Sequence, residues 1–131
     1  WQQVDSAKVL CLVAPETLPG RNALQAQLCD TVRDLAAEGA PIPVETIGFG
    51  DPAVLDRNVA TLLVHASVQE AGGQRLLLFT IRTYRAGRVE TDTLFGAPPR
   101  AVPLTPSGAA DPALHDALAA ALAETLPWRG R

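Results

Sequence analysis

The sequence predicts a single α/β (α+β) domain over residues 1–131, with a mixed sheet of about five strands and two amphipathic helices. A β-hairpin is legible at 61–85, because Gly72-Gly73 supplies the positive φ angles that a two-residue turn requires. Helical spacing of apolar residues marks two further segments. With 131 residues, 47% of them hydrophobic and 19% charged, the chain is long enough to bury one core. The expected order is β-α-β-(short α)-β-β-β-α.

The first three elements follow from short patterns. Residues 8–14 form a continuous Val- and Leu-rich run, typical of a central strand covered on both faces. Asn22 with Gln25 three residues later is a capping-box pattern that predicts the start of a helix, which ends at Gly39. Its apolar stripe is Leu24, Leu28, Val32 and Leu35. Residues 42–49 begin with a proline-flanked stretch, which suits a strand at the edge of the sheet.

Asp51-Pro52 predicts the N-cap of a short helix that runs to about Asn58, and the hairpin follows. Its turn sets the register. The expected pairs are Val68 with Leu77, Ala66 with Phe79, Val64 with Ile81 and, beside the turn, Glu70 with Arg75. The core then lies on one face, and His65, Ser67 and Gln69 lie on the other.

After the hairpin, a turn at 85–88 leads to a further strand at 89–95, which would place Arg82 opposite Asp92 and Tyr84 opposite Glu90. Residues 96–110 are proline-rich and predict an extended loop, anchored to the domain by Val102 and Leu104. Asp111-Pro112 then begins a second helix, which ends at Pro127. Its stripe is Leu114, Leu118, Leu122 and Leu126. The tail 128–131 is expected to fray.

This order resembles the amino-terminal domain of TolB and the related domains of CsgG-type envelope lipoproteins and penicillin-binding-protein activators. Lys8-Val-Leu-Cys-Leu-Val-Ala14 stands where that family has its opening strand, 61–90 matches its strand-turn-strand, and 114–126 matches its terminal helix. The chain departs from the family in having Ala14-Pro15-Glu16 after the first strand, and in its proline-rich segment. The resemblance implies an accessory domain of the bacterial envelope.

Two cysteines lie on elements expected to pack together. Cys11 is on the first strand and Cys29 on the helix that follows, so a disulfide is one expectation and a pair of separate buried thiols is the other. The chain contains no methionine, so we expect that a segment has been removed before Trp1, and a signal peptide or lipid anchor is one candidate for it. Both expectations favour a periplasmic or secreted protein.

No motif indicates catalysis, a metal or a cofactor. His65 and His115 have no further metal ligands at a recognisable spacing, and Glu90 with Asp92 reads as a salt-bridged strand face. With a net charge of −3 and scattered arginines, the chain is not expected to bind nucleic acid. No apolar run approaches the roughly 20 residues that a membrane helix needs, so no membrane insertion by this segment is expected.

The outer face of the hairpin is the candidate partner-binding surface: Leu63, Leu76, Leu78 and Tyr84, beside His65. The opposing interpretation is that a helix covers it. We therefore predict a non-enzymatic interaction domain of the envelope with a protein partner, belonging to a lipoprotein or secreted protein. The alternatives are a small-ligand carrier, which requires an apolar pocket lined by Leu63, Leu76 and Leu78, and a non-catalytic subunit of an enzyme complex.

Overall fold

The computed structural model describes residues 1, 3–87 and 98–129. Its strands are β1 (Ser6–Ala14), β2 (Val44–Thr46), β3 (Val59–Ala71), β4 (Gln74–Tyr84) and β5 (Arg100–Pro103). Its helices are α1 (Arg21–Ala37) and α2 (Pro112–Thr125), with short 3₁₀ helices η1 (Pro52–Leu55) and η2 (Gly108–Ala110). The expected α/β class with a mixed five-stranded sheet and two helices is confirmed.

The strands lie in the order β2-β1-β3-β4-β5. β1 runs parallel to both β2 and β3, whereas β3, β4 and β5 are successively antiparallel. The predicted hairpin register is confirmed in all four pairs. Gly72 and Gly73 have φ angles of 59° and 78°, the positive values that fit this turn. β2 lies at the sheet edge as expected, but only three residues long.

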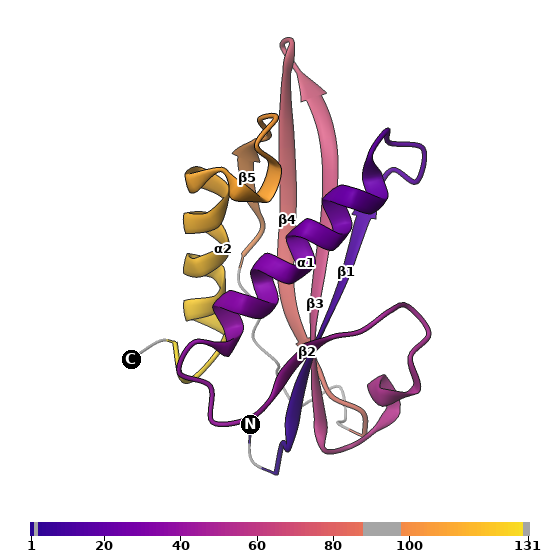
Figure 1. Ribbon diagram of the computed structural model, residues 1–131, viewed down its shortest axis with the longest axis vertical. Helices are drawn as coiled ribbons and strands as arrows, with labels where there is room; N and C mark the ends of the chain where they lie inside the picture. The colour runs from indigo at the N-terminus through magenta and orange to yellow at the C-terminus, as the bar shows by residue number, and fades with distance from the viewer. Residues whose placement is uncertain (2, 88–97, 130–131) are drawn as a thin grey trace.

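Both helices cover the same face of the sheet. In Figure 1, α1 crosses in front of the strands and α2 stands beside it, near β4 and β5. One buried cluster joins alternate residues of β1, β3 and β4 to the apolar stripes of the two helices. Phe79, 2% exposed, is the largest side chain in it. The fold is therefore a two-layer sandwich, and neither α1 nor α2 lies on the second face of the sheet.

The connection from β2 to β3 covers one end of that second face. It passes β1 in the direction opposite to the β1-α1-β2 crossover, so right-handedness places residues 47–58, with η1, on the face opposite α1. η1 contacts β3 there. Asp51 caps η1 as predicted, by accepting a hydrogen bond from the N–H of Ala53 at 2.9 Å. Thr61 is fully buried as a result, and Leu10 is 7% exposed.

The expected cap of α1 is wrong. Gly20, with φ of 73°, occupies the N-cap position, and no side chain caps the helix. Asn22 lies inside the first turn, where its Oδ1 accepts a hydrogen bond from Arg21. The Gln25 amide is engaged with β1 instead of the helix end. The predicted apolar stripe and the end before Gly39 are confirmed.

The expectations for the C-terminal third need two corrections. Part of the predicted loop 96–110 is a strand, β5, which pairs with Leu76–Phe79 of β4, and Val102 and Leu104 anchor it as expected. The tail is not frayed at Trp128 and Arg129. The Trp128 indole donates to the carbonyl of Ala36, and Arg129 bonds to Leu35 and Glu38. The predicted strand 89–95, with its pairs to Asp92 and Glu90, and residues 130–131 lie outside the described residues.

Candidate interaction surface

The candidate surface is the sheet face opposite the two helices, which we call the open face. Strand pairing arranges its residues in rows across β1, β3 and β4. From the η1 end toward the hairpin tip, the rows are Lys8-Thr61-Tyr84, Leu10-Leu63-Arg82, Leu12-His65-Thr80, Ala14-Ser67-Leu78 and Gln69-Leu76. The face is therefore a mixture of leucines, hydroxyls and a few cations.

All four predicted partner-binding residues lie on the open face. Leu63, Leu76 and Leu78 are half-buried, and Tyr84 is 39% exposed. They do not form one continuous patch, however. Leu76 and Leu78 are neighbours on β4 near the hairpin tip, whereas the row of His65 and Thr80 separates them from Leu63. Sequence reasoning missed Leu12, which is half-buried beside His65, in the row between the two groups. Period-2 alternation in β1 was the available signal.

Charges on and around the open face sit mainly at its margins. Lys8 forms an ion pair with Glu45 of the neighbouring β2 at 2.9 Å, and Glu70 pairs with Arg75 beside the turn at 3.6 Å. Both Glu45 and Glu70 are largely exposed, so these pairs contribute little to stability. His65 is exposed at the centre, as the sequence predicted. The centre of the face thus combines apolar side chains with groups able to donate and accept hydrogen bonds.

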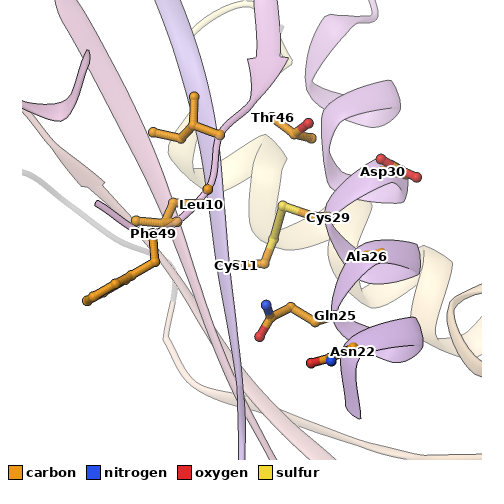
Figure 2. A pocket seen from close by; sticks show the side chains of 11 residues that line it. Leu10, Cys11, Asn22, Gln25, Ala26, Cys29, Asp30, Thr46 and Phe49 are labelled. Atoms are coloured by element: carbon orange, nitrogen blue, oxygen red, sulfur yellow. A yellow bond between two sulfur atoms is a disulfide. The ribbon is translucent and has the colours of Figure 1, made fainter. Parts of the chain in front are cut away.

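Away from the open face, a groove of about 380 Å³ lies beside β1, between α1 and residues 46–49. Figure 2 shows the Cys11–Cys29 disulfide between the strand and α1, with Gln25 and Asn22 along the helix and Phe49 across from them. The disulfide expectation is thereby confirmed, with a Cα–Cα distance of 5.7 Å. Phe49 is 82% exposed. The sequence predicted only that a strand ends at this residue.

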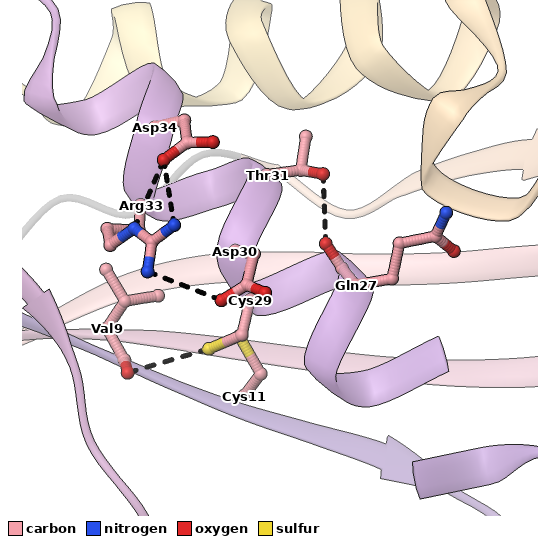
Figure 3. Close-up of polar contacts among 8 residues, drawn as sticks. All are labelled: Val9, Cys11, Gln27, Cys29, Asp30, Thr31, Arg33 and Asp34. Carbon is pink, nitrogen blue, oxygen red and sulfur yellow. Dashed lines mark hydrogen bonds and ion pairs between the residues drawn. A yellow bond between two sulfur atoms is a disulfide. The ribbon is translucent and has the colours of Figure 1, made fainter. Parts of the chain in front are cut away.

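The polar side chains of α1 near the disulfide contact one another or the helix backbone. Figure 3 shows Arg33 paired with Asp34 at 3.0 Å and with Asp30 at 3.5 Å, and the Thr31 hydroxyl donating to the carbonyl of Gln27. Sγ of Cys29 lies 3.6 Å from the carbonyl oxygen of Val9. A bridged sulfur carries no proton, so only a reduced Cys29 thiol could donate to this oxygen.

A second groove, of about 420 Å³, lies between the N-terminal half of α1 and the segment 104–108. Its lining is Leu18, Pro19, Leu24, Gln27, Arg75, Leu104, Thr105, Pro106 and Gly108. Neither groove is lined by Leu63, Leu76 or Leu78. These two grooves therefore do not supply the pocket that the carrier alternative requires.

The described His, Cys, Asp and Glu side chains do not form a metal-binding cluster. No group of three or more His, Cys, Asp or Glu side chains is placed to hold a metal ion in residues 1, 3–87 and 98–129. Asp111 has its pKa lowered, first by the hydrogen bond from the Thr105 hydroxyl and then by the N–H of Ala113, which is the bonding of a helix cap. Within the described part of the chain, neither helix is long and apolar enough to cross a membrane.

Few known proteins match this chain in sequence or in structure. No protein-family model matches it, and no curated protein matches it by sequence. One matching solved structure is a PelC dodecamer from Paraburkholderia phytofirmans, with 12% identity and a TM-score of 0.42 over 97% of this chain and 89% of that one. The resemblance to TolB and CsgG-type domains stays a prediction at the level of element order.

Proposed function

We propose that this chain is a non-enzymatic interaction domain of the bacterial envelope, periplasmic or secreted, that binds a protein partner through the open face. The observation that carries the proposal is the open face itself, where Leu12, Leu63, Leu76 and Leu78 retain solvent exposure on a sheet whose two helices both lie on the other side. Apolar side chains that lie together within a polar surrounding mark partner surfaces, and Leu76 and Leu78 are such neighbours on β4.

The disulfide supports the compartment. Cys11 and Cys29 join β1 to α1, and structural disulfides persist in oxidising compartments while cytosolic thiols are kept reduced. Both cysteines are more than 90% buried, which fits a structural bridge.

Site-specific photocrosslinking in cells tests the proposed surface. A photoreactive residue at His65, exposed at the centre of the open face, should give a discrete adduct whose protein component mass spectrometry identifies. The matched control is the same residue at Ala120, exposed on α2 on the opposite side of the molecule. An adduct from Ala120 with none from His65 would place the interaction on the helical layer and refute the proposal.

A further inference from the structure

The outer edge of β1 is only partly covered by β2. β1 has nine residues, but β2 pairs with Ala7–Val9 alone. The N–H of Ala7 donates to Pro43, and the carbonyl of Val9 accepts from Ile47, so the odd-numbered residues of β1 direct their backbone groups toward β2. Because this direction repeats every second residue, Cys11 and Val13 direct theirs the same way, beyond the end of β2.

At Val13, two side chains of α1 take the place of the missing strand. The N–H of Val13 donates to Oε1 of Gln25 at 3.0 Å, and its carbonyl accepts from Nε of Arg21 at 2.6 Å. One acceptor and one donor are what a neighbouring strand would supply to this residue. Figure 2 shows the Gln25 side chain reaching from α1 toward β1, beside the groove of about 380 Å³.

At β2 and β5, prolines protect the edges of the sheet against pairing with another strand. Pro41 and Pro43 precede β2, and Pro98, Pro99 and Pro103 lie before and within β5. Proline has no N–H to donate to an incoming strand, so it discourages edge-to-edge pairing. Residues 10–14 of β1 contain no proline and are all apolar, which is the composition that promotes strand addition.

We propose that Arg21 and Gln25 block the outer edge of β1. They prevent β1 of a second copy of this chain from pairing with this edge as an additional strand. With both side chains removed, the N–H and carbonyl of Val13 are free to pair with the same edge of another molecule, antiparallel about a two-fold axis. This surface is separate from the open face, so the inference does not depend on the proposed function.

The test compares the wild-type protein with the Arg21→Ala/Gln25→Ala variant by sedimentation and by hydrogen exchange. The variant should self-associate at least about tenfold more tightly, because it gains inter-strand hydrogen bonds worth about 1 kcal/mol each. In the associated form, the amides of Cys11 and Val13 should become protected from exchange. The matched control is Gln27→Ala. It removes the acceptor for the N–H of Ala109, which is not at a strand edge, so this variant should associate like wild type.

Two outcomes would overturn the proposal: unchanged association of the double variant, or association with no protection at Cys11 and Val13. Gln25→Glu keeps an acceptor for the N–H of Val13, so combined with native Arg21 it should behave like wild type. Should the double variant unfold, Arg21→Ala and Gln25→Ala are compared separately, since each frees one backbone group of Val13; association no tighter than wild type in both single variants would overturn the proposal.

Discussion

At the scale of single residues, Phe79 and His65 report which face of the hairpin is core. Phe79 is buried between the sheet and the helices, whereas His65 is exposed on the open face. Phe79→Ala should lower the free energy of unfolding by about 3 to 5 kcal/mol, because it leaves a cavity in close-packed surroundings. His65→Ala should cost well under about 1 kcal/mol. Urea denaturation measures both, and a mild Phe79 variant beside a strongly destabilised His65 variant would mean that the two faces are reversed.

Asp111 is a residue whose titration should affect stability. Its Oδ2 accepts from the Thr105 hydroxyl at 2.7 Å, and Oδ1 accepts from the N–H of Ala113 at 2.8 Å. Because these bonds lower its folded pKa, the carboxylate stabilises the fold above its unfolded pKa of about 4, and that contribution is lost as pH falls through the folded value.

Asp111→Asn keeps the cap acceptor but does not titrate. The urea midpoint of wild type should therefore fall relative to that of the variant between about pH 5 and pH 2. A difference between the two midpoints that stays constant over this range would show that the cap does not depend on the charge.

At the scale of elements, the disulfide ties α1 to β1. Cys11 and Cys29 are 18 residues apart, and closing a loop of this size stabilises a fold by about 3 kcal/mol in the chain-entropy model. Reduction should lower the urea midpoint accordingly. Protein made under oxidising conditions, unfolded without reductant and treated with an alkylating reagent, should gain no mass, and two alkylated thiols in that sample would contradict the bridge.

Elements whose pattern is local could be predicted, and those that depend on distant contacts could not. The hairpin register followed from Gly72-Gly73 and side-chain alternation, both encoded within a few residues. The start of α1 was misplaced because Gln25, in a capping position, bonds to β1 instead. Trp128 and Arg129 look like a free tail until α1 supplies the carbonyls of Ala36 and Leu35.

The candidate surface shows the same division. Alternation in β3 and β4 was enough to place Leu63, Leu76, Leu78 and Tyr84 on one face. Whether helices cover that face depends on the handedness of two crossovers and on where α2 packs, which no single segment encodes. β5 was missed because prolines dominate its surroundings, although an edge strand tolerates proline.

At the scale of the whole molecule, the two sheet faces differ in what covers them. The helical layer builds the core and brings the chain ends together, where the Trp1 and Trp128 rings meet edge to face at 5.1 Å. The open face adds little to that core, so its leucines are free to serve binding. Since a few apolar anchors carry most of the energy of an interface, removing two of them should abolish binding without unfolding the domain.

The most direct measurement is the Leu76→Ser/Leu78→Ser variant, examined by thermal melting and by capture of the partner identified through crosslinking at His65. We predict a melting temperature within a few degrees of wild type, about the shift expected for a surface change, together with loss of capture. Ala120→Ser, at an exposed position of α2 on the opposite side of the molecule, should retain both. A folded double variant that still captures the partner, or one that unfolds, would contradict binding through the open face.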